Sequence, residues 1–268
     1  MSAQSAAAAS AAASAAAPSA ALSQGHLAEA GFGWRERLSL AFMRRMLASP
    51  EGRAHLLSQT AEAESSGEAR IFDQALARVD DPELQRLIGR HRADELRHEQ
   101  LFRDRLRATM TVVPAVPAEL RLIDRLDQKL GSILERTITD DRGVLEAYCL
   151  LQALEERAVT QFPVMAAALE PVDPESARVF REVLEDEKRH LLYCVAVAKR
   201  YAASEAERLE VLSLMRAAET EAFAENQRAN LAFALERGLV SGAAALPWRV
   251  LLLLLGLVQP LPRTRFAR

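Results

Sequence analysis

Two stretches of the chain, residues 94–98 (DELRH) and 186–190 (DEKRH), repeat one pattern. In each copy a glutamate and a histidine are three residues apart. On an α-helix, residues at this spacing lie on the same face, one turn apart. Each copy can therefore present a carboxylate and an imidazole to one point, and two such helices that face each other could hold two metal ions.

The distance from each motif to the preceding helix start is also repeated. Glu95 lies 13 residues after Pro82, and Glu187 lies 13 residues after Pro174. Both prolines follow an aspartate, as is typical of a capped helix start. We interpret the two regions as two versions of one antiparallel helical hairpin, which predicts a pseudo-twofold bundle with a site on its axis.

The composition of the 268-residue chain favours helices throughout. Half of the residues are apolar, and glycine and proline number only 11 each, so we predict an all-α fold. The net charge of −3 and the lack of a basic, aromatic-rich patch argue against a nucleic-acid partner. The two cysteines, Cys149 and Cys194, form no CxxC motif, which excludes a zinc ribbon and is consistent with a reducing cytoplasm.

Helix start and stop signals divide the chain into three parts. Residues 1–33 are predicted to be a disordered Ala/Ser-rich tail, residues 34–237 a helical domain, and residues 238–268 an apolar C-terminal segment. Within the domain, the core bundle should cover residues 50–202. We expect helices over 34–48, 50–79, 82–109, 118–138, 141–169, 174–202 and 205–237, with 118–138 crossing between the two hairpins.

The C-terminal segment leaves three interpretations open. Residues 250–258 are leucine-rich, but a membrane-spanning helix needs about 20 apolar residues. Residues 239–262 could instead bind a membrane surface, which would place the protein peripherally on the inner face of a membrane. Alternatively, they could cover the bundle or form the interface of a homodimer. A true membrane span is the third interpretation.

Distances from the hairpin turns indicate which residues face the two motifs. Glu64 precedes the first turn by about as many residues as Glu95 and His98 follow it, and it lies on the inward line of its helix. Glu155 has the same relation to Glu187 and His190. Glu156 is a competitor, because it matches Glu64 when the repeats are overlaid without gaps, but we prefer Glu155.

Six potential metal ligands should therefore meet at one level of an apolar bundle: Glu64, Glu95, His98, Glu155, Glu187 and His190. Several bare carboxylates in a dry core would each cost several kcal/mol, on the order of the penalty for burying an unpaired charge. A pair of divalent or trivalent cations would remove this cost.

At these residues, over about 50–202, the chain resembles the ferritin-like superfamily of di-iron carboxylate proteins. The resemblance implies a four-helix bundle that binds two iron ions, or manganese, through the six residues, with Glu95 and Glu187 bridging the metals. It also implies that Asp94 and Asp186 accept hydrogen bonds from the ligand histidines across the bundle. His91 and Tyr148 lie on the same inward lines. His91 is a core histidine, a proton donor or an extra ligand, and Tyr148 is a packing residue or borders an oxygen pocket.

The resemblance implies an oxidoreductase that activates O₂ or peroxide and hydroxylates an apolar substrate. Because rubredoxin-type cysteines are absent, electrons must come from an external donor. The alternative is a ferroxidase, iron-handling or peroxide-scavenging protein without an organic substrate. A large apolar channel beside the site would favour hydroxylation, whereas a tight polar path would favour metal handling.

Overall fold

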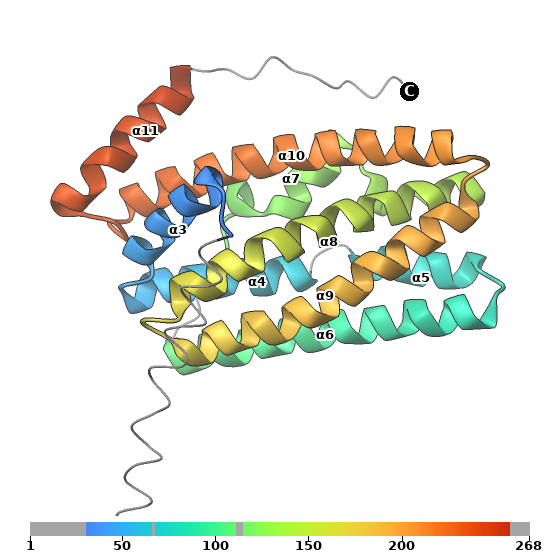
Figure 1. Ribbon diagram of the computed structural model, residues 1–268, viewed down its shortest axis with the longest axis horizontal. Helices are drawn as coiled ribbons and strands as arrows, with labels where there is room; N and C mark the ends of the chain where they lie inside the picture. The colour runs from blue at the N-terminus through green and yellow to red at the C-terminus, as the bar shows by residue number, and fades with distance from the viewer. Residues whose placement is uncertain (1–30, 66–67, 111–114, 258–268) are drawn as a thin grey trace, which may run out of the picture.

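The computed structural model describes residues 31–65, 68–110 and 115–257, and these residues form helices and connections without a β-strand (Figure 1). Most of the predicted N-terminal tail and the last 11 residues, 258–268, lie outside the described residues. The elements are α3 (Trp34–Met46), α4 (Pro50–Ser65), α5 (Glu68–Arg78), α6 (Pro82–Thr109), η1 (Ala118–Leu120), α7 (Leu122–Lys129), η2 (Ile133–Glu135), α8 (Asp141–Leu169), α9 (Pro174–Tyr201), α10 (Glu205–Glu236), η3 (Gly242–Ala245) and α11 (Leu246–Leu257).

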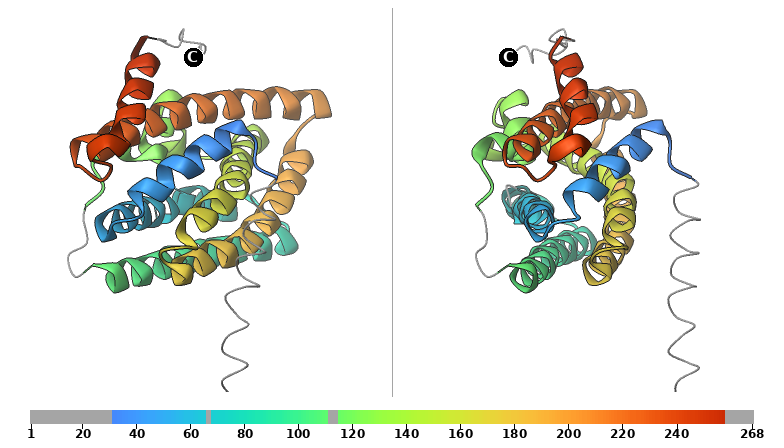
Figure 2. Two further views of the ribbon diagram at one scale, coloured as in Figure 1. Left: turned by 60° about the vertical axis from the view of Figure 1, so that its left-hand side comes forward. Right: turned by 90° about the vertical axis from the view of Figure 1, so that its left-hand side faces the viewer.

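Two helical hairpins form the centre of the molecule. Helices α4 and α5 both pack on α6, and α8 packs along α9. The hairpins meet where α6 lies beside α9, as the end-on view in Figure 2 shows. Helix α10 covers α8, and α7 packs on α10. The all-α prediction is therefore confirmed.

The repeated Asp-Pro pairs start α6 and α9 as their sequence predicts. The Asp81 carboxylate accepts hydrogen bonds from the backbone N–H groups of Glu83 and Leu84, at 2.8 and 3.2 Å. The Asp173 carboxylate accepts one from the backbone of Ser176 at 3.1 Å. Each cap satisfies backbone donors that a helix start leaves without a partner. The two motif helices consequently begin at equivalent positions.

Two of the predicted helices differ in the structure. The structure has two helices, α4 and α5, where a single helix was expected over 50–79. They lie on either side of the undescribed residues 66–67. The sequence here, Ser65-Ser66-Gly67, consists of weak helix formers. The crossover helix expected over 118–138 is reduced to α7, flanked by two short 3₁₀ turns. Gly131 and Ser132 adopt left-handed conformations, with φ of 65° and 60°, and end the helix there.

A polar layer divides the apolar interior into two clusters. One cluster contains Phe102, Phe162 and Phe180, whose rings pack against one another with centroids 4.8–6.2 Å apart. The other contains Phe72 and Tyr148, both fully buried. Along α6 the buried motif residues lie between Ile88 of one cluster and Phe102 of the other, and along α9 they lie between Leu184 and Cys194. The packing of large aromatic side chains on both sides thus fixes the level of the polar layer.

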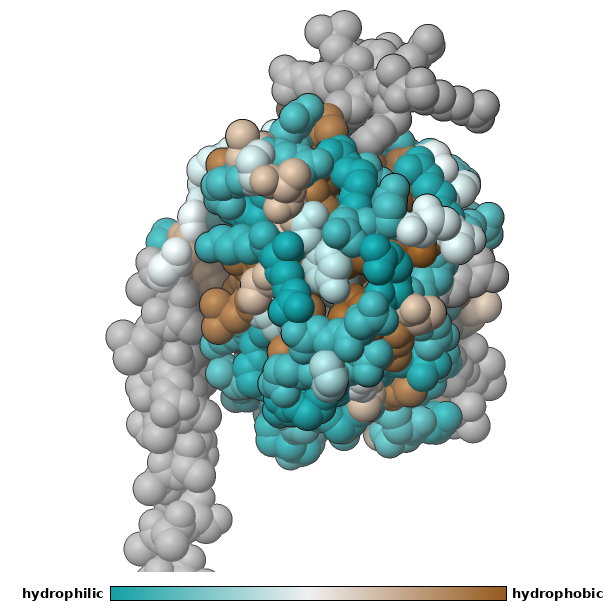
Figure 3. Space-filling view, turned by 90° about the vertical axis from the view of Figure 1, so that its right-hand side faces the viewer, coloured by the Kyte–Doolittle hydropathy of each residue, from teal (hydrophilic) through white to brown (hydrophobic). Residues whose placement is uncertain are grey.

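Helix α11 combines a packed face with an exposed one. The Trp248 ring is buried and meets the edge of Phe42 on α3, with centroids 5.1 Å apart. On the other face, Leu246, Leu253 and Leu254 are 55–70% exposed. No helix in the described ranges has the length and apolar character needed to cross a membrane. The opposite end of the molecule, which carries the α5–α6 and α9–α10 turns, is mostly hydrophilic (Figure 3).

Candidate metal centre

The six predicted ligands come together in the polar layer. Helix α4 supplies Glu64, α6 supplies Glu95 and His98, α8 supplies Glu155, and α9 supplies Glu187 and His190. Their donor atoms form two groups, and within each group the atoms lie within 4.8 Å of one another. The groups are Glu64, Glu95, His98 and Glu187, and His91, Glu95, Glu155 and His190. We call the first group the His98 subsite and the second the His190 subsite.

Glu95 and Glu187 each turn one carboxylate oxygen towards each subsite. The two oxygens of Glu187 lie 3.3 Å from His98 Nδ1 and 3.0 Å from His190 Nδ1. The two oxygens of Glu95 lie 3.8 and 3.3 Å from the same two nitrogens. Glu64 and Glu155 instead approach one motif histidine each, His98 at 3.4 Å and His190 at 3.9 Å. The arrangement suits two bridging and two terminal carboxylates.

The outer nitrogen of each motif histidine faces an aspartate of the other motif. His98 Nε2 lies 3.2 Å from Asp186 Oδ2, and His190 Nε2 lies 3.3 Å from Asp94 Oδ2. When these aspartates accept a hydrogen bond from Nε2–H, the Nδ1 atom of each histidine faces the carboxylates and is available to a metal ion. These crossed contacts follow the pattern that the resemblance implies.

Two arginines, Arg97 and Arg189, form ion pairs with the two aspartates. Neither arginine was predicted from the sequence as a site residue. Arg97 and Arg189 each contact both Asp94 and Asp186. The guanidinium groups are partly exposed, whereas the aspartates are largely covered. Both arginines occupy the fourth position of the repeated motif, D-E-x-R-H. This repetition is a sequence signal from which their contact with the aspartates could have been predicted.

His91 makes the two subsites unequal. Its Nε2 atom lies 3.0 Å from a carboxylate oxygen of Glu95 and 3.0 Å from one of Glu155, and its ring stacks on His190 with centroids 3.8 Å apart. His91 lies nine residues after Pro82, and the residue nine after Pro174 is Val183. The His98 subsite therefore has no counterpart of this third imidazole. Of the roles that the sequence left open for His91, its geometry suits an additional ligand.

The remaining candidates lie outside the cluster. Glu156 points to α10, where it forms an ion pair with Arg216 at 2.5 Å and accepts a hydrogen bond from Gln152. The structure therefore brings Glu155, and not Glu156, to the subsites. Tyr148 is fully buried in an apolar cluster and shares a 2.5 Å hydrogen bond with Tyr193, which suits a packing role.

Burial and neighbouring charges shift the pKa values of the cluster residues in different directions. Burial raises the pKa values of Glu64 and Glu155 well above the ordinary range. Burial also opposes the charge on Glu95, but its histidine neighbours hold its pKa well below that range, and the pKa of Glu187 falls to about 2 for the same reason. Despite burial, neighbouring carboxylates raise the pKa of His98 to about 12 and that of His190 to about 9. Without metal, two carboxylates and two imidazoliums thus balance each other.

One buried nitrogen indicates that protein contacts alone leave the cluster incomplete. His98 Nδ1 is buried and has no hydrogen-bond partner among the described residues, although Glu64 and Glu187 lie 3.4 and 3.3 Å away. A buried polar atom without a partner is unfavourable and rare. A cation between these groups would satisfy the nitrogen and neutralise the carboxylates, so the donor set fits a metal.

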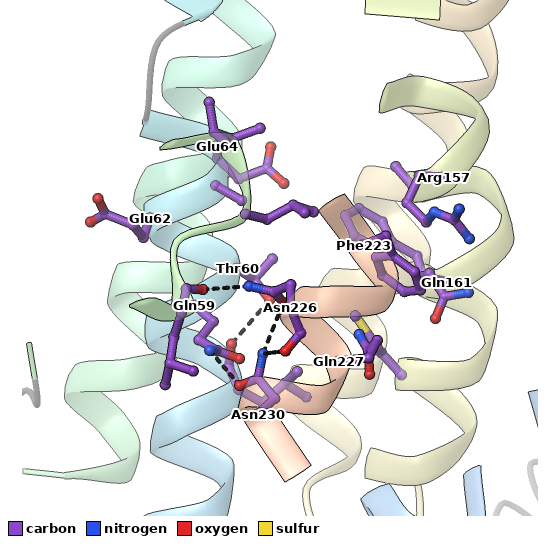
Figure 4. Close-up of a pocket in the computed structure, with 18 of the residues that line it drawn as sticks. Gln59, Thr60, Glu62, Glu64, Arg157, Gln161, Phe223, Asn226, Gln227 and Asn230 are labelled. Atoms are coloured by element: carbon purple, nitrogen blue, oxygen red, sulfur yellow. Dashed lines mark hydrogen bonds between the residues drawn. The ribbon is translucent and has the colours of Figure 1, made fainter. Parts of the chain in front are cut away.

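A cavity of about 180 Å³ reaches the cluster from the side of α3 and α10 (Figure 4). The four cluster carboxylates of Glu64, Glu95, Glu155 and Glu187 form one end of its lining. Much of the remaining wall is apolar and includes Phe42, Leu154, Phe162, Met165 and Phe223. This cavity was not predicted from the sequence, because helical periodicity does not determine how α10 packs on the hairpins.

Comparison with known proteins finds no protein-family model, curated protein or solved structure that matches the chain.

Proposed function

We propose that the chain is a di-iron, or di-manganese, carboxylate oxidoreductase with a ferritin-like bundle, and that it hydroxylates an apolar organic substrate. The observation that carries this proposal is the pair of carboxylates, Glu95 and Glu187, that each face both His98 and His190. Together with Glu64 and Glu155, they match the ligand pattern of di-iron carboxylate bundles. A donor set of carboxylates and imidazoles suits iron and manganese.

The residues divide into two metal positions. Glu64 and His98 would be terminal ligands of one ion, and Glu155, His190 and His91 of the other. Glu95 and Glu187 would contribute to both. Asp94 and Asp186 hold the histidine rings in orientation, and Arg97 and Arg189 contact both aspartates.

Two reduced iron ions at these positions would supply electrons for the reduction of O₂ or peroxide. Hydroxylation by O₂ inserts one oxygen atom into a C–H bond and releases the other as water. It consumes two electrons and two protons in addition to the two electrons of the C–H bond, so the metals must be reduced again after each turnover. The two cysteines, Cys149 and Cys194, are buried and form no CxxC motif, and we propose that an external donor provides the electrons. The apolar part of the cavity wall would limit the access of water to the reacting atoms.

The cavity favours an organic substrate over iron handling. Outside the four cluster carboxylates, the acidic residue among the described lining residues is Glu62, and it pairs with Arg121 at 3.5 Å. An entry path for iron would be expected to carry unpaired acidic groups, because a cation is attracted by negative potential. This wall instead offers phenyl rings, aliphatic side chains and amides.

Metal analysis after anaerobic Fe(II) loading tests the proposal. We expect about two irons per chain in the wild type, as in other di-iron bundles, and fewer than one in the Glu95→Ala/Glu187→Ala variant. Glu156→Ala is the matched control, since Glu156 neighbours Glu155 but faces Arg216. Oxygen uptake on exposure to air should follow the iron content. Wild-type protein that holds no iron, or a double variant that holds as much as the control, would contradict the proposal.

A further inference from the structure

The cavity beside the cluster has a second end that is formed by uncharged amides. Asn226, Gln227 and Asn230 of α10, Gln59 of α4 and Gln161 of α8 all line it. In Figure 4 this group lies below Glu64, which marks the metal end of the cavity. A molecule in the cavity would therefore meet carboxylates at one end and amides at the other.

Charged groups at the cavity wall are already paired. Arg121 lies 3.5 Å from Glu62, and Arg157 donates hydrogen bonds to Glu219 at 2.8 Å while its guanidinium covers the ring of Phe223. An anionic ligand would find no free cation among the described lining residues outside the metal positions. Transfer of a carboxylate into such a site is unfavourable, so the wall selects an uncharged ligand.

The amides fall into two sets. Asn230 accepts a hydrogen bond from Gln59 at 2.6 Å and donates one to Asn226 at 2.8 Å, so these three residues satisfy one another. In Figure 4, Gln161 and Gln227 lie below Phe223, and no hydrogen bond is drawn from either of them to the other residues shown. Each of these two glutamines carries a donor and an acceptor, and can therefore bind either a hydroxyl or a carbonyl group.

The size of the cavity limits what it can enclose. At about 180 Å³ it slightly exceeds a cavity of roughly 150 Å³ that holds one benzene molecule in another protein. The enclosed part of a ligand is therefore a single ring or an aliphatic group of similar volume. The phenyl rings of Phe162 and Phe223 offer favourable contacts to an aromatic ring.

From the size, the neutral wall and the two glutamines, we infer that this cavity binds an uncharged single-ring compound that carries a hydroxyl or carbonyl group. Gln161 and Gln227 hold the polar group, and the ring extends towards the metal end. The inference rests on the proposed function, in which this compound is the substrate, and it assigns substrate recognition to residues outside the cluster.

Calorimetric titration of the full-length protein with phenol, benzoate and toluene tests the inference. The three probes share one ring and differ in charge and hydrogen-bonding capacity. Phenol should bind at least tenfold more tightly than benzoate, because the described cavity wall offers no unpaired cation to the benzoate carboxylate. Phenol should bind about fivefold more tightly than toluene, because its hydroxyl group can form hydrogen bonds with the two glutamines. Benzoate binding as tightly as phenol would overturn the inference.

Three variants locate the binding site. Gln161→Leu/Gln227→Leu should weaken phenol binding by about tenfold and leave toluene binding nearly unchanged. Gln128→Leu is the matched control, since Gln128 is exposed on α7 and lies outside the cavity lining. Ala158→Phe, which places a ring in the cavity, should abolish binding of both compounds. Unchanged phenol binding in the double variant or in Ala158→Phe would overturn the inference.

Metal content distinguishes this inference from the function on which it rests. Each protein is titrated without added metal and again after loading with Mn(II), and bound manganese is counted separately. Selective phenol binding in protein that retains neither manganese nor, after anaerobic Fe(II) loading, iron would reject the proposed function and retain the binding site. Bound manganese without selective phenol binding would reject the inference and retain the metal centre.

Discussion

His98 Nε2 lies 3.2 Å from Asp186 Oδ2, so a carboxylate of α9 orients a histidine of α6. The reciprocal contact joins His190 of α9 to Asp94 of α6 at 3.3 Å. Each motif thus supplies both a metal-facing histidine and the group that orients the histidine of the other motif. The two hairpins must be assembled before either imidazole is fixed.

Replacing one of these aspartates should weaken metal binding without removing a ligand. We expect Asp186→Asn to lower the affinity of the His98 subsite by about 10- to 100-fold, the usual range for loss of an outer hydrogen-bond partner. Glu185→Gln is the control, because Glu185 is adjacent but pairs with Lys188 on the surface. Competition with a chelator measures the affinity. Equal affinities in the two variants would show that the aspartate does not orient the histidine.

Metal binding should release protons and strengthen as pH rises. The raised pKa values of Glu64, Glu155, His98 and His190 favour their protonated forms in the metal-free protein, and a bound cation requires the deprotonated forms. Two divalent ions can therefore displace up to four protons, and affinity should fall as pH is lowered from 8 to 6. Calorimetry in two buffers of different ionisation enthalpy counts the protons. Release of fewer than one proton per chain would refute this charge balance.

His91 should make the two metal ions bind in separate steps. The His190 subsite has this additional imidazole, so it should fill first in a Mn(II) titration. His91→Val copies the residue at the equivalent position of the second hairpin, Val183, and should weaken the tighter step by about tenfold or more. His98→Ala should instead remove the weaker step. Identical isotherms for the wild type and His91→Val would mean that His91 only packs against Phe72.

The exposed face of α11 should bind anionic lipid vesicles. Leu253 and Leu254 are 70% and 55% exposed, and Arg263, Arg265 and Arg268 follow in the sequence. Leucines on one face with nearby basic residues are typical of interfacial binding. Leu253→Gln/Leu254→Gln should reduce co-sedimentation with such vesicles severalfold, whereas Leu192→Gln, at an equally exposed site on α9, should not. Equal sedimentation of the two variants would argue against a membrane surface.

Local sequence signals predicted the long helices of the two hairpins well. The helix expected over 141–169 matches α8 at both ends, because Asp140 caps its start and the periodic apolar residues stop before the Pro171–Pro174 turn. Counting from the hairpin turns also placed Glu64 and Glu155 at the level of the motifs. Turn position and helical pitch are local properties, so they can be read from the chain without knowledge of the tertiary structure.

Other features depend on contacts that no local pattern contains. Helix α7 ends early because Gly131 and Ser132 adopt left-handed backbone conformations. The sequence predicted a longer helix because Ile133 and Leu134 continue its apolar spacing. The cavity exists because α10 packs over α8 and faces α4 across the gap. Its glutamines and asparagines resemble ordinary polar residues of an amphipathic helix when only the sequence is considered.

Helix α10 lines the cavity but contributes none of the seven residues of the two subsites. Helix α10 therefore shapes part of the cavity without supplying a residue of the proposed metal centre. Substitutions at Phe223, Gln227 or Asn230 could alter which molecules enter while the metal ligands remain in place. In protein engineering, the cavity-lining residues of α10 could therefore be randomised to change which molecules bind, while the proposed metal ligands stay unchanged.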